Sequence, residues 1–282
     1  MMSLKSPIRK LIWSLPRPIL IYYAKIKFKS KLKISKYGNL IKISGRKKTS
    51  NEHIFIHHPE RISRYLIGIN ARLELLGREY LLKELLLDLS KKSNQEFIKN
   101  HFIIDVGSNI GEFTLIAAKY FPNAKFIGFE PESFENLASR INTSYIDNLL
   151  IEKALFSEVK EVLFYHNNKT DDSSLFPAKL NSNSSEILTT TLDLEIKKLS
   201  IQTIFLLKIE AEGAEPEVLL GATNTLNVTK YVVVDVGPER GVLREETFNS
   251  VNSILVNSGF TLVHKTKDGR NIVLYKNMEF NS

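Results

Sequence analysis

Two short runs of this chain combine glycines and acids at a spacing that suits the binding of a nucleoside. The first run is His101–Glu112, in which Gly107 and Gly111 follow a stretch of apolar residues, and the second is Gly128–Pro131. Glycine lets the backbone turn tightly and approach a ligand closely. An acid at the end of the next strand, here Glu130, can accept hydrogen bonds from two ribose hydroxyls. The two runs therefore predict a strand, a glycine-rich turn, a helix and a second strand that together hold a nucleoside.

The spacing of the glycines indicates which nucleoside is bound. A dinucleotide-binding turn has the pattern G-x-G-x-x-G, but counted from Gly107 its second and third glycines are replaced by Asn109 and Glu112. Gly107 and Gly111 instead have the spacing of a methyltransferase turn whose middle glycine is replaced, and Glu130 follows Gly111 by 19 residues. Glu112 at the start of a helix would repel a phosphate but attract a sulfonium or an amino group. These residues favour S-adenosylmethionine over NAD as the cofactor.

A second group of charged residues stands at the end of the apolar strand predicted over Ile204–Ile209. Lys208, Glu210 and Glu212 lie where ligands bind in open α/β sheets, and the strand period of two puts Lys208 and Glu210 on one side. Glu210 or Glu212 is our candidate to contact the acceptor or to act as the base, with Lys208 beside them. The alternative is a structural ion-pair network that supports the loop, because buried charges need partners.

Strand and helix patterns alternate from residue 101 onward, which predicts an α/β fold with a Rossmann-like, mostly parallel sheet. Apolar runs predict strands at residues 102–106, 125–129, 149–152, 161–165, 204–209 and 231–236. Helical spacing predicts helices at about residues 111–120, 132–142, 215–222 and 245–257. Residues 260–265 and 271–275 are expected to close the sheet as an antiparallel hairpin, because Asp268-Gly269 favours a tight turn. Residues 167–185 are polar and are expected to form a long loop, in which Ser173 and Ser174 could line the substrate mouth.

The N-terminal part of the chain differs in composition from the rest. Residues 1–50 contain 14 of the 39 Lys and Arg residues and no acid, which leaves 25 bases against 31 acids in the remaining residues. Alternation of Lys with apolar residues over Lys25–Ile34 predicts a half-buried strand, with partner strands at residues 38–43 and 53–56. We therefore expect three parts, which are a basic arm with short strands (1–60), a helical cover (61–98) and a methyltransferase domain (99–282).

The basic arm indicates an anionic partner. Trp13 and Tyr22 among the lysines suit contact with an anionic membrane surface through residues 1–48, although packing on the domain or on a second subunit of a homodimer fits the same pattern. The apolar run over residues 11–24 is interrupted by prolines and is too short to span a bilayer. We expect a cytoplasmic protein, either free or peripheral on the inner face of the membrane.

The numbers and positions of cysteine and histidine residues limit the metal and thiol chemistry that the chain can perform. The chain has no cysteine, so disulfides, thiolate metal sites and cysteine nucleophiles are excluded. His53, His57 and His58 are close in sequence, but no neighbouring carboxylate completes a metal-binding pattern, and we expect no metal. His166 follows a predicted strand near the polar loop, and position alone marks it as a candidate base.

Four blocks, in this order along the chain, resemble the FkbM family of S-adenosylmethionine-dependent methyltransferases. The most specific block contains Lys208–Glu217, in which the family usually has Asp where this chain has Glu210. The resemblance covers about residues 100–275, and it implies a class I methyltransferase sheet. It also implies methyl transfer to an oxygen, often a sugar hydroxyl of a glycan, a lipid-linked saccharide or a natural product. The blocks are Ile104–Thr114, Gly128–Pro131, Thr190–Asp193 and Leu207–Ala222.

The resemblance further implies roles for individual residues. Asp105 would orient the glycine turn or accept a hydrogen bond from the cofactor's amino group, Glu130 would hold the ribose, and Ala154 would lie beside adenine. The turn itself would lie under the methionine part of the cofactor. The predicted cofactor-binding residues are Asp105, Gly107, Ser108, Asn109, Gly111, Glu130 and Ala154, and the acceptor is expected to be a saccharide or a small molecule.

The sequence leaves two alternative functions open. An RNA methyltransferase would bind phosphates with the basic arm, but nucleic acid is a poor partner for the acidic segment Glu210–Gly213. An inactive membrane-associated scaffold would have no need of Glu130 and the glycine turn. Asp193 is expected to cap or brace a helix, and Glu215 and Glu217 are expected to suit a helix dipole.

Overall fold

The structure is a computed structural model that describes residues 16–27, 32–45, 53–59, 62, 80–92, 101–166, 173–177, 183–266 and 271–280. The described residues form two compact units, in which residues up to 80 belong to the first unit and residues from 81 onward to the second. The three-part division expected from the sequence, with boundaries at residues 60 and 98, stays a prediction.

The second unit is built on a sheet of seven strands, which are β4 (Phe102–Val106), β5 (Lys125–Phe129), β6 (Asn148–Ile151), β10 (Ile204–Ile209), β11 (Thr229–Asp235), β14 (Phe260–Lys265) and β15 (Ile272–Asn277). Their order is β14-β15-β11-β10-β4-β5-β6. Neighbouring strands are parallel except at β15, which runs antiparallel to both β11 and β14. The structure thus confirms the α/β class, the mostly parallel sheet and the closing antiparallel hairpin.

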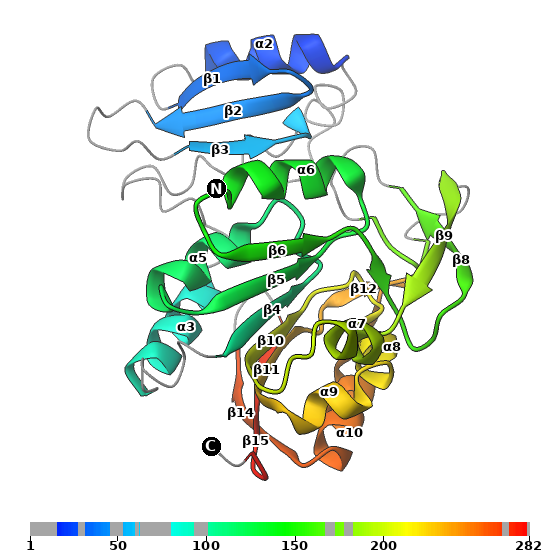
Figure 1. Ribbon diagram of the computed structural model, residues 1–282. Coiled ribbons are helices and arrows are strands. Elements are labelled where there is room, and N and C mark those ends of the chain that lie inside the picture. Colours follow the sequence, from blue (N-terminus) through cyan, green and yellow to red (C-terminus); the bar gives the residue numbers. More distant parts are fainter. Residues whose placement is uncertain are drawn as a thin grey trace. The chain divides into compact units, whose positions relative to one another are not determined.

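Helices cover both faces of this sheet (Figure 1). On one face, α5 (Glu112–Tyr120) and α6 (Ser133–Asn142) follow β4 and β5. On the other, α8 (Glu215–Leu220), α9 (Thr223–Asn227) and α10 (Phe248–Asn257) follow β10 and β11. Two further helices, α3 (Tyr80–Lys92) and α7 (Leu192–Lys198), precede β4 and β10. Buried Leu, Ile and Val side chains from α7 to α10 and from the central strands form the main core.

The order of the strands determines where a ligand can bind. The chain runs outward from β4 through β5 to β6 and then returns to β10 on the other side of β4. Where the connections from two neighbouring strands lead to opposite sides, a crevice opens at the carboxyl ends of these strands, here β4 and β10. The loops after β4 and β10, which begin at Gly107 and Glu210, therefore face each other at this switch point.

Smaller sheets flank the main one. β7 (Ala154–Leu155), β9 (Ser184–Thr190) and β8 (Glu161–Tyr165) pair in that order, and β12 (Pro238–Arg240) pairs with β13 (Glu245–Glu246). The expected loop over residues 167–185 is wrong for residues 184–185, which begin β9. The sequence pattern of β9 is weak because most of the strand is exposed and polar, and even Leu188 is 64% exposed.

The first unit contains α2 (Arg17–Lys27) and an antiparallel sheet of β1 (Leu32–Tyr37), β2 (Leu40–Gly45) and β3 (His53–Ile56). The strand expected over Lys25–Ile34 is wrong at residues 25–27, which form the last turn of α2. Apolar residues recur there at helical spacing, and prolines suit the helix start. The alternation holds within β1, where Ile34 is buried between exposed neighbours.

Several predictions lie outside the described residues. They concern Trp13 in the arm, the lysines at 29 and 31, the helical pattern over residues 63–79 and the turn at residues 267–270. Among the described residues, no helix has the length and apolar character needed to cross a membrane.

Candidate active site

The turn after β4 approaches the loop after β10 so closely that it requires glycine. Gly107 has φ 71°, and a Cβ atom there would lie 1.9 Å from the backbone oxygen of Glu210. The backbone amides of Gly107 and Ser108 both donate to the oxygen of Phe129 at 3.0 Å, which ties the turn to the end of β5. Three strand ends, from β4, β5 and β10, therefore meet at Gly107.

Asn109 occupies the position at which many such turns have glycine. Its φ is 49°, in the left-handed region that asparagine adopts more readily than most residues. Its side-chain oxygen accepts a hydrogen bond from the amide of Ile110 at 2.8 Å, and its own amide donates to Glu130. The replacement of glycine by asparagine thus keeps the shape of the turn.

Gly111 serves the packing of the turn against α6. Its φ is 85°, and a Cβ atom would lie 2.7 Å from Cγ2 of Thr143 and 2.8 Å from Oγ of Ser139. Gly128 in β5 has a similar role, since a Cβ atom there would lie 2.6 Å from Leu150 and 3.0 Å from Oγ of Ser108. The buried Ser108 thus packs on the neighbouring strand.

Glu130 is the buried acid at the end of β5. Its Oε2 accepts a hydrogen bond from the amide of Asn109 at 2.8 Å, and its Oε1 accepts one from the amide of Glu132 at 2.9 Å. Burial raises the pKa of Glu130 to about 7, against the opposing effect of these two hydrogen bonds. A carboxylate oxygen can accept more than one hydrogen bond, so each oxygen can also accept from one hydroxyl of a ribose diol.

Lys208 lies beneath the turn with its ammonium group almost fully buried. Its Nζ is 2.9 Å from Oδ1 of Asp105 and 3.3 Å from Oε2 of Glu210, and it donates to the backbone oxygens of Val106 at 3.2 Å and Gly107 at 2.9 Å. Burial raises the pKa of Asp105, and the charge of Lys208 opposes that effect. Lys208 therefore joins β4, the glycine turn and the first acid of the β10 loop.

The loop after β10 is held in shape by hydrogen bonds to Ser174 and to Glu215 of α8. Glu212 has φ 50°, and its backbone oxygen accepts a hydrogen bond from Oγ of Ser174 at 2.7 Å. The buried Glu215 accepts from the amides of Ala211 at 2.9 Å and Gly213 at 3.0 Å. Glu215 thus supports the loop from inside, and burial raises its pKa.

Arg240 braces the same loop from β12. It makes two hydrogen bonds with the carboxylate of Glu217 at 2.8 and 2.7 Å, and it donates to the backbone oxygen of Gly213 at 2.7 Å. Its guanidinium lies 3.9 Å from the ring centre of Phe176. The hydrogen bonds to Glu217 raise the pKa of Arg240. The sequence could not identify Arg240, because the segment after β11 contains no recognisable motif.

His166 lies between Glu132 and Ser185. Its Nδ1 contacts the carboxylate of Glu132, and its Nε2 lies 2.8 Å from Oγ of Ser185. Glu132 is two residues beyond Glu130, and its amide is bound by the carboxylate of Glu130. The pair formed by His166 and Glu132 could not be found from the sequence, because 34 residues separate its members.

Two other residues singled out in the sequence, Ala154 and Asp193, have their described contacts with β9 and with α9. Ala154 is buried in β7, where it pairs with Thr189 of β9. Asp193 caps the start of α9, since its carboxylate accepts from the amides of Asn224 at 3.0 Å and Thr225 at 2.7 Å. Burial raises the pKa of Asp193, but these hydrogen bonds outweigh that effect and hold it below the ordinary value.

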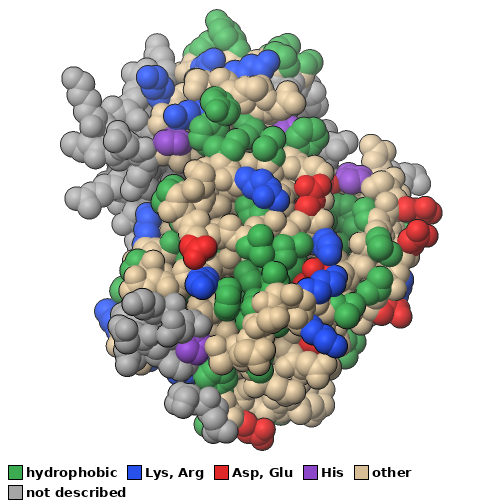
Figure 2. Space-filling view, viewed as in Figure 1, with side chains coloured by type: hydrophobic (Ala, Val, Ile, Leu, Met, Phe, Trp, Pro, Cys, Tyr) green, Lys and Arg blue, Asp and Glu red, His purple; other side chains and the backbone are tan. Residues whose placement is uncertain are grey.

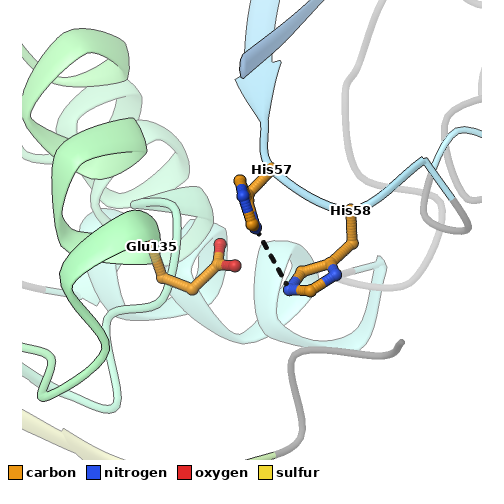
Figure 3. A group of neighbouring side chains, drawn as sticks. All are labelled: His57, His58 and Glu135. Carbon is orange, nitrogen blue, oxygen red and sulfur yellow. Dashed lines mark hydrogen bonds between the residues drawn. The ribbon is translucent and has the colours of Figure 1, made fainter. Parts of the chain in front are cut away.

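The histidines of the first unit adjoin each other after β3. Nδ1 of His57 lies 3.4 Å from Nε2 of His58, and their rings meet edge to face (Figure 3). Glu135, which the figure also labels, belongs to α6 of the second unit. The expectation that the protein uses no metal stays a prediction.

The strand order and the glycine turn are those of a Rossmann-like methyltransferase that uses S-adenosylmethionine. Glu130 at the end of β5 would fit this cofactor, since its two oxygens can each accept a further hydrogen bond from a ribose hydroxyl. The chain belongs to the FkbM methyltransferase family, since residues 105–262 match the family model described as the methyltransferase FkbM domain.

Two fungal proteins are similar to this chain in sequence. Methyltransferase sdnD of Sordaria araneosa is 28% identical over 58% of this chain and 74% of its own length. Methyltransferase 1 of Beauveria bassiana is 24% identical over 70% of this chain and 86% of its own length. Both relatives are named as methyltransferases, in agreement with methyl transfer as the reaction.

Solved structures resemble the chain less closely. The precorrin-6y C5,15-methyltransferase of Geobacter metallireducens has 12% identity and a TM-score of 0.39, covering 72% of this chain and 92% of its own. The ribosomal protein L11 methylase of Lactobacillus delbrueckii has 14% identity and a TM-score of 0.37, covering 70% of this chain and 78% of its own. Both TM-scores lie below 0.5, and the fold assignment rests on the strand order.

Proposed function

We propose that this methyltransferase transfers its methyl group to a hydroxyl oxygen of a saccharide or a related small molecule. The observation that carries the proposal is the Glu210 carboxylate, which stands across from the glycine turn and 3.3 Å from the buried ammonium of Lys208. A carboxyl group beside the cofactor turn suits an alcohol acceptor, which must lose a proton during transfer.

When bound, S-adenosylmethionine supplies the electrophilic methyl group. The residues of this chain then have to hold the acceptor in line with that group, because alignment of the reacting atoms lowers the barrier. Glu210, whose side chain is 23% exposed, accepts a hydrogen bond from the attacking hydroxyl and orients its lone pair. The Glu212 backbone, fixed by Ser174, and the Arg240–Glu217 pair hold the loop that carries Glu210 in position.

Charge also favours a neutral acceptor over a polyanion. The loop after β10 presents Glu210 and Glu212 within three residues, and an acidic loop repels phosphates. The nucleic-acid alternative would require that the substrate enter past these acids. Binding to RNA that falls steeply with salt, combined with methylation of that RNA, would favour the alternative.

A methyl-transfer assay tests the proposal. Labelled S-adenosylmethionine is offered with saccharides, lipid-linked saccharides and an RNA control, and the variants are Glu210→Gln and Glu212→Gln. We expect transfer to a hydroxyl acceptor, with kcat lower by about 100-fold or more in Glu210→Gln and with cofactor affinity within about threefold of the native value. Asp147→Asn is the matched control, because Asp147 is exposed before β6, at the opposite edge of the sheet.

The proposal fails if the label is transferred to nitrogen, carbon or RNA, or if Glu210→Gln is as active as Asp147→Asn on the best acceptor.

A further inference from the structure

The first unit carries an apolar stripe on α2 that the fold leaves exposed. Ile19, Tyr22 and Ile26 recur at i, i+3 and i+7, so they share one face of the helix. Their exposed fractions are 49%, 67% and 53%. A surface helix usually turns such a stripe toward the core of its domain, whereas this stripe faces outward. In Figure 2, hydrophobic side chains are visible at the top of the view, in the region of α2.

The surroundings of the stripe are basic. Lys25 is exposed on α2, and Lys33 and Lys36 are exposed on β1, which is next to α2 in sequence and packs against it. Residues 1–51 contain no Asp or Glu, so no acid of this segment offsets these charges. In Figure 2, Lys and Arg side chains lie close to the hydrophobic ones at the top of the view. Apolar residues and tyrosine beside lysines are the side chains that helices at a membrane interface carry.

We propose that α2 docks the protein on the surface of a membrane that contains anionic lipids. The helix has 11 residues and is therefore about 16 Å long, about half of the hydrocarbon thickness of a bilayer. It lies in the plane of the interface, with Ile19, Tyr22 and Ile26 among the lipid headgroups. The lysines contact lipid phosphates, so binding depends on both the apolar stripe and the positive charge. This proposal is independent of the acceptor and of the role of Glu210.

Vesicle flotation with the full chain tests the proposal. Vesicles of phosphatidylcholine alone are compared with vesicles in which one third of the lipid is phosphatidylglycerol. We expect the native protein to bind the anionic vesicles at least about tenfold more strongly than the neutral ones, and this preference should shrink as salt is added. The double variant Ile19→Ser/Ile26→Ser should bind anionic vesicles at least about tenfold more weakly than the native protein.

Matched controls separate the stripe from general stickiness. Leu188→Ser/Leu243→Ser removes two apolar side chains of the second unit that are 64% and 82% exposed, and it should bind as the native protein does. Lys25→Gln/Lys33→Gln/Lys36→Gln should lose affinity for anionic vesicles while its unfolding temperature stays within about 2 °C of native.

The proposal is overturned by any of three results. The first is absence of vesicle binding by the native protein, and the second is equal binding by the two apolar double variants. The third is a concentration-dependent dimer that is lost in Ile19→Ser/Ile26→Ser, found together with no vesicle binding by the native protein. The stripe would then be an interface between two copies of the chain.

Discussion

Binding of the cofactor is expected to depend on the ionisation of Glu130. Burial raises the pKa of this carboxyl to about 7 in the free protein, so the acid is protonated below pH 7 and ionised above it. Each of its oxygens already accepts one backbone amide, from Asn109 or from Glu132. The ionised form can accept two more hydrogen bonds from a ribose, whereas the added proton of the acid occupies one of those positions.

The size of the effect follows from the pKa. If only the ionised form binds, the apparent dissociation constant rises as the ionised fraction falls. At pH 8 nearly all of the protein is competent, and at pH 6 about one tenth is. The affinity should therefore fall about tenfold from pH 8 to pH 6, which corresponds to about 1.4 kcal/mol.

Isothermal titration calorimetry with S-adenosylhomocysteine measures this dependence. The ligand carries ionisable amino and carboxyl groups of its own, so the variant Glu130→Gln serves as the control for the ligand's own contribution. We expect the variant to bind more weakly at pH 8 and to lose the tenfold change that the native protein shows. Equal pH dependence of the native protein and the variant would refute the role given to Glu130.

Three further substitutions test the architecture around the turn. Gly107→Ala should lower the free energy of unfolding in urea by about 2–4 kcal/mol, because the new methyl would collide with the Glu210 carbonyl; a loss below about 1 kcal/mol would contradict that contact. Lys208→Met should cost about 3–5 kcal/mol by leaving buried Asp105 without its cation, and adding Asp105→Asn to it should restore part of the loss; no recovery would argue against the ion pair. Asp193→Ala should cost about 1 kcal/mol as a lost helix cap with kcat unchanged, and a large fall in kcat would show that Asp193 acts in catalysis.

Much of the sheet and of the cofactor turn could be predicted because each is encoded within a short stretch. The apolar run Ile204–Ile209 is long enough to mark a buried central strand, and the distance from Gly111 to Glu130 reflects one helix and the strand after it. Asn109 could be accepted in place of glycine, although its left-handed backbone is visible only in the structure.

Features that depend on distant segments could not be predicted. The Arg240 brace joins residues that are 23 apart, the His166–Glu132 contact spans 34, and the link from Ser174 to Glu212 spans 38. The last turn of α2 is helical where the sequence predicts a strand, because alternating Lys and apolar residues fit both periods over so few positions. Tertiary contacts, and not local pattern, decide such cases.

A crystal structure of the protein with S-adenosylhomocysteine tests the central claim most directly. We predict both ribose hydroxyls within about 3 Å of the Glu130 carboxylate, with the amino-acid part of the ligand over the turn from Gly107 to Asn109. A ligand bound elsewhere, or bound here with its ribose turned away from Glu130, would contradict the account.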